Sequence, residues 1–365
     1  MAGHSSESRW ICGIEPSSKV LTSSMNEIYA MECREQPKSL ARLLLAYSED
    51  PSIKKEMDEL RQMSRSAGPI IFSGMGASYC SALTAASFLQ SHGRPSFAVD
   101  ASEWLHYACE VWDDAAAFVL ITASGESAEL VKLQKSAPKP AILLCNNDQS
   151  TCWSSAKIRL PILAGPEYGN ATKTYTNATA ASIVLASHIL GRAWQEEADQ
   201  AAQAYASCLD EIFEMRGELE RFCRGAANIE VIGRGPAYGG AIMSALCIRE
   251  MTGHRAAPHS GGGFRHGPLL DVNESHVAII SAFGRTADLG IKLARDCNER
   301  GGKVILVGSV ELPASNRLLP VKMASVPETW EAISSVLVPQ ALTLGIAEYS
   351  GAKLAPRFQY GAMTE

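Results

Sequence analysis

The chain has 365 residues, of which 46% are hydrophobic and 20% are charged, and its formal net charge is −6. This length allows two domains of ordinary size, each with a core of its own. An acidic chain lacks the basic surface that neutralises phosphates, so we expect no nucleic-acid partner and a small-molecule ligand instead.

The N-terminal part of the chain predicts a tail followed by helices. Residues 1–24 carry Ser, Gly and Pro without hydrophobic periodicity, and we expect them to form a flexible tail. A helical pattern follows the cap residues Ser23 and Ser24, breaks near Pro37 and resumes to residue 46. A second helix follows Pro51.

From residue 69 onward, short apolar runs alternate with amphipathic helical segments. The first half has predicted strands at residues 69–72, 97–99, 118–122 and 141–145, with helices at 82–90 and 127–134. A long helical stretch links the halves at residues 179–222. The second half has predicted strands at 229–232, 277–282, 304–307 and 319–323, and a final apolar helix at 330–349. Such alternation predicts parallel sheets with helices on both faces.

The two halves repeat each other at an offset of 159 residues. Residues 70–79 align with residues 229–238, and the two segments share a Gly-x-Gly turn and a tyrosine. Residues 120–130 align with residues 279–289 at the same offset. Two strand–glycine–helix units in register make a chance match improbable.

The repeat predicts an α/β protein of two tandem doubly wound, flavodoxin-like parallel-sheet domains, with boundaries at residues 25–200 and 201–365. Phe283 stands in the second copy where Ser124 stands in the first. Because the first copy keeps hydroxyls that the second has lost, we expect the ligand to bind the first.

Ten cysteines are scattered singly without a C-x-x-C pair, which favours buried reduced thiols over disulfides or zinc ligands. The first nine residues are polar, unlike a signal peptide, and we find no apolar run that approaches membrane-spanning length. We therefore expect a cytoplasmic protein without membrane association.

Two polar loops follow predicted strands of the first half, at residues 74–78 and 122–127. Unpaired N–H groups and the helix dipole favour an anion at such places, and hydroxyls suit a phosphate monoester. The alternatives are a tight glycine turn and a simple N-cap by Ser124 or Ser127. Neither loop has a nucleoside-triphosphate or NAD pattern. The predicted binding residues are Met75, Gly76, Ala77, Ser78, Thr122, Ala123, Ser124 and Ser127.

Several motifs carry a resemblance to a known family. They lie at residues 74–79, 122–127, 167–176, 233–238, 249–251 and 264–268. With these motifs the chain resembles the sugar isomerase (SIS) family of double-domain phosphosugar isomerases and deglycases, which includes the isomerase half of glucosamine-6-phosphate synthase. The resemblance covers residues 25–365.

The resemblance implies two catalytic residues, Glu250 and His266. Glu250 would move a proton between C1 and C2, and His266 would assist ring opening from the neighbouring subunit. A sheltered carboxylate and an imidazole suit these steps. Without the resemblance they read as a helix-surface acid and a turn residue. Residues 261–263, all glycine, suggest a loop that moves or approaches a ligand closely, or a tolerant surface turn.

The chain also departs from the family pattern. The near-terminal lysine that forms an imine with a ketose is absent, and Lys353 is the nearest candidate. Gly263 stands in place of the family glutamate, and Cys247 stands in place of the lysine on the Glu250 helix. Only a short tail precedes the first domain, so we expect no glutaminase domain and no transfer of amide nitrogen.

We therefore expect an enzyme acting on a sugar or amino-sugar 6-phosphate, with its phosphate on Ser78, Thr122, Ser124 and Ser127. Isomerisation, deglycation of a C1-amine ketose and deamination remain open. The resemblance implies a homodimer with shared sites and a C-terminal tail that returns to the site; neither a metal nor an organic cofactor is expected. The rival functions are a non-catalytic sugar-phosphate sensor and an enzyme for another anionic sugar, such as a sulfonated one.

Overall fold

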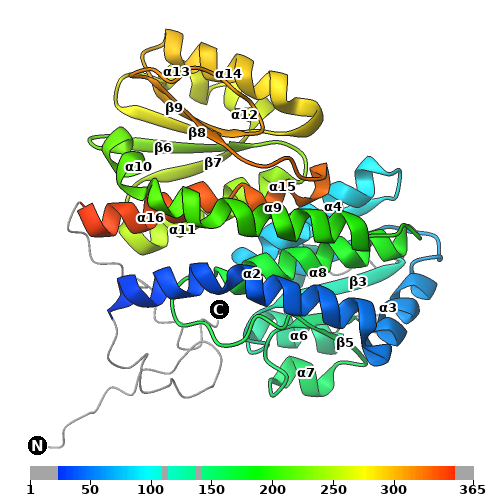
Figure 1. Ribbon diagram of the computed structural model, residues 1–365. Coiled ribbons are helices and arrows are strands. Elements are labelled where there is room, and N and C mark those ends of the chain that lie inside the picture. The colour runs from blue at the N-terminus through cyan, green and yellow to red at the C-terminus, as the bar shows by residue number, and fades with distance from the viewer. Residues whose placement is uncertain (1–23, 109–113, 137–140, 350–365) are drawn as a thin grey trace, which may run out of the picture.

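A computed structural model of the protein describes residues 24–108, 114–136 and 141–349. It contains two parallel five-stranded sheets, each with helices on both faces, stacked with helical layers between them (Figure 1). The predicted fold, two tandem doubly wound α/β units, is confirmed. Of the predicted tail, residues 1–24, only Ser24 is described, as the N-cap of the first helix; residues 1–23 and the C-terminal tail, with Lys353, lie outside the described residues.

The first sheet has the strand order β2-β1-β3-β4-β5. Its strands are β1 (Ile70–Gly74), β2 (Ser96–Asp100), β3 (Ala117–Thr122), β4 (Ile142–Cys145) and β5 (Ile158–Pro161). The helices of this half are α2 (Met25–Glu49), α3 (Pro51–Met63), α4 (Ala77–Ser91), α5 (Ala101–Glu103), the π-helix η1 (Trp104–Ala108), α6 (Ala128–Ser136), α7 (Thr151–Ser155) and α8 (Lys173–Ile189).

The second sheet has the order β10-β9-β8-β6-β7, the same arrangement as the first. Its strands are β6 (Asn228–Gly233), β7 (Ala256–Ser260), β8 (His276–Ala282), β9 (Lys303–Gly308) and β10 (Leu318–Lys322). The helices are α9 (Gln195–Glu214), α10 (Arg216–Cys223), α11 (Ala237–Thr252), α12 (Gly261–Arg265), α13 (Pro268–Asp271), η3 (Gly284–Thr286), α14 (Ala287–Glu299), η4 (Glu328–Trp330), α15 (Glu331–Ser334) and α16 (Leu337–Tyr349).

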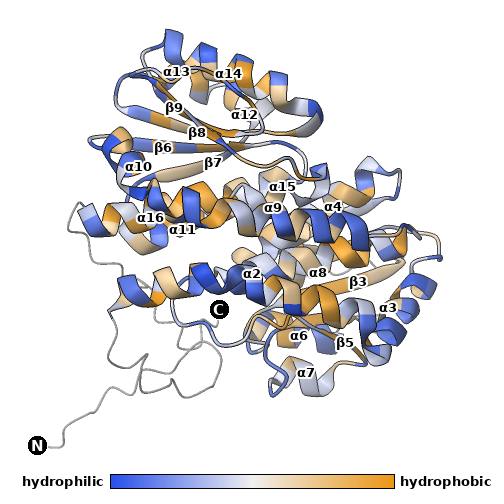
Figure 2. Ribbon diagram, in the orientation of Figure 1, coloured by the Kyte–Doolittle hydropathy of each residue, from blue (hydrophilic) through white to orange (hydrophobic). Residues whose placement is uncertain are grey.

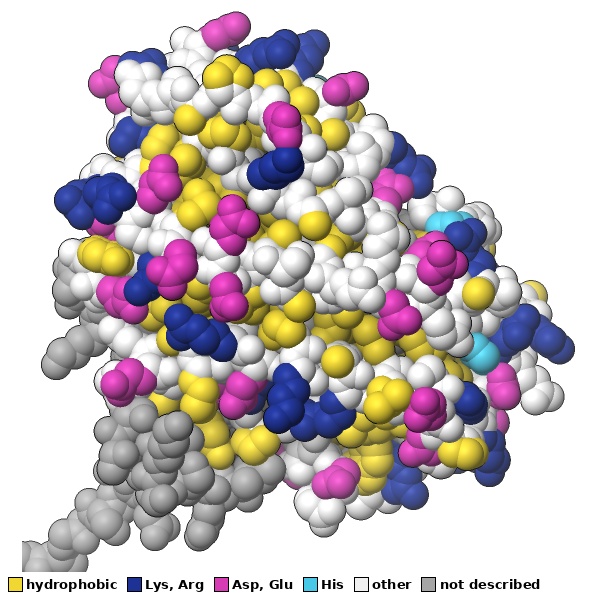
Figure 3. All heavy atoms as spheres, in the orientation of Figure 1, with side chains coloured by type: hydrophobic (Ala, Val, Ile, Leu, Met, Phe, Trp, Pro, Cys, Tyr) yellow, Lys and Arg dark blue, Asp and Glu magenta, His cyan; other side chains and the backbone are white. Residues whose placement is uncertain are grey.

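One hydrophobic core joins the two halves. Ile70 and Phe72 of β1 and Ile229 and Val231 of β6 face the same cluster, which also contains the inner faces of α4, α8, α11 and α16. Two smaller clusters lie on the outer faces of the sheets, under α6 and α14. Figure 2 shows the hydrophobic residues concentrated in the strands and the central helices. Figure 3 shows acidic and basic side chains interspersed over the visible surface.

The predicted break at Pro37 is wrong, because α2 runs through this proline. Proline has no N–H to donate to the carbonyl four residues earlier. Here the Gln36 side chain donates to that carbonyl, on Cys33, at 3.0 Å. The buried face of the helix and this substitute hydrogen bond keep α2 continuous.

Two strands were missed, and two helical segments are divided. Both β5 and β7 are short edge strands that contain a proline, which weakens their sequence signal. The stretch predicted at 179–222 is three helices starting earlier, at Lys173, and Gly191 with φ +69° follows the first of them. The predicted final helix is divided into η4, α15 and α16.

The expectation that no apolar run reaches membrane-spanning length is also wrong. Glu328–Tyr349 has 22 residues and is long and apolar enough to cross a membrane. Its most apolar part is fully buried inside the fold, as in the core helix of a globular protein. The eight described cysteines are all unpaired and buried, as predicted.

Candidate active site

Two loops of the first half lie side by side at the carboxyl edge of the first sheet. β1 and β3 are neighbours, and α4 and α6, which follow them, pack on opposite faces of the sheet. The loops therefore diverge and form the crevice where open α/β sheets bind ligands. The eight predicted binding residues are all placed here: Met75, Gly76, Ala77 and Ser78 after β1, and Thr122, Ala123, Ser124 and Ser127 after β3.

Glycines shape both loops. Gly76 is exposed at the N-terminus of α4 with φ +54°, and Gly125 has φ +68°. A Cβ on Gly125 would lie 2.1 Å from the Ser150 hydroxyl, so this loop can close only on glycine. Above Gly76, by contrast, a Cβ would meet a single atom, Leu246 Cδ2 at 4.0 Å.

The hydroxyls of the second loop have different surroundings. Thr122 is buried, and its Oγ1 accepts a hydrogen bond from the Gly125 N–H at 3.0 Å. Ser124 Oγ accepts from the Glu126 N–H at 3.2 Å. Ser127 is half-buried, and no intramolecular side-chain hydrogen bond of it occurs within the described residues. Thr122 and Ser124 thus hold the turn, and Ser127 keeps both its donor and its acceptors for a ligand.

A third loop, residues 166–172, reaches the same edge of the sheet ahead of α8. α8 packs along α4, and the Ser81 and Thr179 hydroxyls hydrogen-bond at 2.9 Å. The buried Glu167 carboxylate accepts from the Thr172 N–H at 2.9 Å and from the Thr174 hydroxyl. It therefore caps the start of α8 and fixes the shape of the loop.

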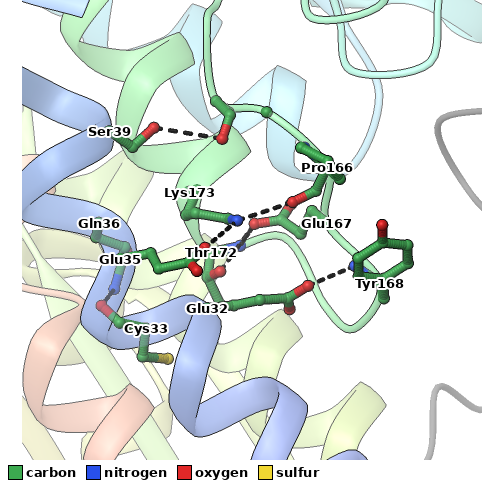
Figure 4. Close-up of polar contacts among 12 residues, drawn as sticks. Glu32, Cys33, Glu35, Gln36, Ser39, Pro166, Glu167, Tyr168, Thr172 and Lys173 are labelled. Carbon is green, nitrogen blue, oxygen red and sulfur yellow. Dashed lines mark hydrogen bonds and ion pairs between the residues drawn. The ribbon is translucent and has the colours of Figure 1, made fainter. Parts of the chain in front are cut away.

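The buried Glu32 of α2 anchors this loop from the other side (Figure 4). Its carboxylate accepts from the backbone N–H groups of Tyr168 at 2.5 Å and Gly169 at 3.3 Å. Burial, together with the nearby Glu167 carboxylate, raises the pKa of Glu32 to about 8. Sequence reasoning missed Glu32, although an acid within the apolar stripe of a helix is a usable signal.

Beside Glu32, Lys173 of α8 links the loop of residues 166–172 to α2. Its Nζ donates to the Glu35 carboxylate at 2.6 Å and to the Pro166 carbonyl at 2.8 Å. This loop is thus tied at several points to a helix that comes more than a hundred residues earlier.

Glu250 of α11 belongs to the second half but lies beside the first. Leu246 reaches the position above Gly76, and Glu250 follows one turn later on the same helix face. α11 and α4 run antiparallel, because Gly239 meets Cys80 while Leu246 meets Gly76. Glu250 therefore lies beyond the N-terminus of α4. It is half-buried there, and its charge contributes, after burial, to the raised pKa of Cys80.

Cys247, which stands where the family has a lysine, points into the core. Its Sγ lies 3.1 Å from the Tyr29 hydroxyl and 3.8 Å from Thr343 Oγ1. The Cys247 side chain therefore packs α11 against α2 and α16.

His266 lies far from Glu250 within one chain. α11 runs antiparallel to the strands of the second sheet, and a short turn leads from its C-terminal end into the start of β7. Glu250, near that end of α11, therefore lies at the amino edge of the second sheet. His266 follows β7 and is exposed at the carboxyl edge. The five residues of β7 alone span about 15 Å. The two predicted catalytic residues therefore do not meet in a single chain.

Residues 261–263 are not a free loop. They form the first turn of α12, and Ser260 Oγ accepts from the Gly263 N–H at 3.1 Å. The structure therefore corrects the interpretation of these glycines as a loop.

The equivalent crevice of the second half is closed. Phe283 is 3% exposed and packs in the core. The Glu331 side chain, 3% exposed, lies so close to Gly284 that a Cβ there would be 2.6 Å from its Oε1. Burial, together with Glu328, raises the pKa of Glu331 to about 8. A carboxyl group and an aromatic ring thus fill the place where the first half keeps hydroxyls.

Comparison with known proteins agrees with this fold. The SIS domain family matches residues 63–188 and 224–344. The glutamine–fructose-6-phosphate aminotransferase (isomerizing) of Pyrococcus horikoshii is 28% identical over 334 residues, covering 88% of this chain and 54% of that protein. The chain thus spans about half the length of the curated relatives it matches.

Solved structures share the fold. The C-terminal domain of glucosamine-fructose-6-phosphate aminotransferase from Francisella tularensis superposes with a TM-score of 0.80 at 21% identity, covering 93% of this chain and 99% of that one. Tagatose-6-phosphate ketose/aldose isomerase from Escherichia coli gives a TM-score of 0.70 at 17% identity, covering 94% and 97%. With two parallel sheets and both halves matched, this chain belongs to the SIS domain family.

Proposed function

We propose that the protein is a cytoplasmic enzyme that binds the open-chain form of a sugar 6-phosphate and transfers a proton between C1 and C2. The loops after β1 and β3 hold the phosphate, with Ser127, Ser78 and the backbone N–H groups at the start of α4 as donors. Glu250 is the base. The relatives reported above bear names of enzymes that act on ketose or amino-sugar 6-phosphates.

The observation that carries the proposal is the contact between Leu246 and the Gly76 position. It brings the second half's Glu250 to the mouth of the first half's polar crevice. The Glu250 carboxylate is near the phosphate-binding loops but on a different helix. It can therefore face the C1–C2 end of a substrate whose 6-phosphate is held in those loops. A general base has to be within reach of the proton that it removes.

The chemistry needs no further group to balance. Glu250 takes the proton from the carbon next to the carbonyl, which leaves an enediolate. A proton passes from the hydroxyl oxygen to the former carbonyl oxygen, and Glu250 returns its proton to the former carbonyl carbon. Half-burial of the carboxylate limits proton exchange with solvent between the two steps.

His266 would serve the site of a second copy. Its exposure at the far edge of the second sheet suits a homodimer in which each site takes Glu250 from one chain and His266 from the other. There the imidazole would open the sugar ring or protonate the leaving group.

The test is proton NMR in D₂O on a panel of sugar 6-phosphates and C1-amine ketose 6-phosphates, with wild type and Glu250→Gln in parallel. We expect deuterium at C1 or C2 with wild type only, while Glu250→Gln retains ligand binding. Silence of the wild type across the panel, with binding intact, would instead identify a sugar-phosphate sensor.

A further inference from the structure

Two arginines lie together at the carboxyl edge of the second sheet. Arg234 follows β6, at the repeat position of Met75 in the first half. Its guanidinium packs on Gly261, where a Cβ would lie 2.4 Å from Cζ and Nε. Arg265 follows Gly261 by four residues in α12, so it projects from the same side of that helix.

This pair carries a positive charge that the chain does not neutralise. Arg265 forms an ion pair with Asp296 at 2.5 Å. Arg234 is half-buried, and within the described ranges its side chain makes neither a hydrogen bond nor an ion pair. Its partial burial and the Arg265 charge hold the pKa of Arg234 below its usual value. A guanidinium in such surroundings is stabilised by an anion, which it can bind through two parallel N–H groups.

The surroundings leave room for that anion. Gly235 and Gly262 are exposed, and a Cβ on either would meet nothing within 4 Å. The exposed His266 directly follows Arg265. The crevice between β6 and β8 is filled by Phe283 and Glu331, whereas the backbone at Gly235 and Gly262 borders open space.

We propose that Arg234 and Arg265 bind a carboxylate on the C1 amine of the substrate, so that the substrate class is ketosamine 6-phosphates derived from amino acids. This inference rests on the proposed function, in which His266 enters the partner's site and brings its neighbouring arginines with it. The phosphate at C6 occupies the loops of the first half. Cations beside the histidine therefore face the opposite end of the substrate, at C1.

The reaction of such a substrate balances with water alone. Glu250 removes a proton from C1 of the open-chain ketosamine, and the C1–C2 double bond of an enaminol forms. Protonation at C2 leaves an imine between C1 and nitrogen. Water adds to C1, the C1–N bond breaks, and the aldose 6-phosphate and the free amino acid leave.

The experiment compares two ligands that differ in one charge. Fructosyl-glycine 6-phosphate carries the carboxylate, and fructosyl-glycinamide 6-phosphate replaces it with a neutral amide. Both are titrated calorimetrically into Glu250→Gln protein, which should not consume them. We expect the glycine adduct to bind at least about 10-fold more tightly, because charge-assisted hydrogen bonds are lost with the amide.

Arg234→Ala or Arg265→Ala, added to Glu250→Gln, should remove this preference and leave the glycinamide affinity unchanged. The glycinamide affinity also reports whether each variant is folded. Lys292→Ala, which removes an exposed cation from α14, is the control for net charge. Equal affinity for the two adducts in the parent, or a preference that survives both arginine variants, would overturn the proposal.

Turnover by wild-type protein separates this proposal from the proposed function. If the adducts are discriminated in binding but neither is consumed, the anion site stands and the proposed catalysis fails. If both are consumed at equal kcat/KM and bind equally, the catalysis stands and the anion site fails.

Discussion

Gly239 of α11 lies against the backbone carbonyl oxygen of Cys80 in α4, and the two residues are equivalent in the repeat, 159 positions apart. The equivalent helices of the two copies therefore cross at equivalent points, as around a two-fold axis. The N-terminal halves of the two helices therefore overlap, and the second half of each helix runs past the start of the other. This crossing is what brings Glu250 to the loops of the first half.

Gly239→Ala should destabilise this contact. A Cβ there would lie 2.4 Å from the Cys80 carbonyl oxygen and 2.5 Å from Thr84 Oγ1. Overpacking against backbone costs about 1–3 kcal/mol, more than alanine gains in helix propensity. Urea unfolding would measure the loss, with Gly262→Ala as the control because a Cβ there meets nothing within 4 Å. Equal stabilities would contradict the close crossing.

Glu331→Gln should stabilise the protein at pH 8. Burial raises the pKa of Glu331 in the folded state to about 8, from an ordinary value of 4.5, so the folded state keeps a proton that the unfolded state has released. The free energy of unfolding therefore falls as pH rises from about 4.5 to 8, by at most about 1.4 kcal/mol per pH unit. Unfolding midpoints measured across this range should show a shallower slope for the variant. Glu299→Gln, at the exposed end of α14, should keep the wild-type slope.

Ser127→Ala and Thr122→Val should separate ligand binding from loop stability. The Ser127 hydroxyl makes no side-chain hydrogen bond within the described residues, so Ser127→Ala should leave the free energy of unfolding unchanged. Because the hydroxyl is proposed to bind the phosphate, the same substitution should raise KM for a sugar 6-phosphate about 10-fold. Thr122→Val removes the acceptor of the Gly125 N–H and should cost about 1–2 kcal/mol of stability as well. A stability loss for Ser127→Ala equal to that of Thr122→Val would show that Ser127 also supports the loop.

Mixed dimers should regain activity if Glu250 and His266 serve the same site from different chains. Inactive Glu250→Gln and His266→Asn proteins, unfolded together and refolded, would form heterodimers with one intact site each. Random mixing then predicts about a quarter of wild-type activity. Activity that stays at the level of the separate variants would mean that each site takes both residues from one chain or that the chains do not exchange.

The sequence alone was sufficient for the repeat, the two parallel sheets and the two polar loops. Hydrophobic alternation and glycine turns are local signals, and the loops at neighbouring strand ends follow from parallel topology. The repeat offset also aligned Phe283 with Ser124 without any knowledge of contacts.

Local pattern failed where distant segments decide the outcome. Pro37 interrupts a helix in isolation, but the Gln36 side chain and the packing of α2 keep it continuous. Glu32 and Glu331 read as ordinary acids, and only burial by segments far away in sequence gives them raised pKa values.

The site itself is a tertiary feature. Glu250 lies more than 170 positions from Gly76 in sequence, and the crossing of α4 and α11 places it beside that loop. The same topology puts His266 at the opposite edge of the second sheet. Periodicity specifies which face of each helix is buried, but the close approach at Gly239 determines which two faces meet and therefore where the carboxylate lies.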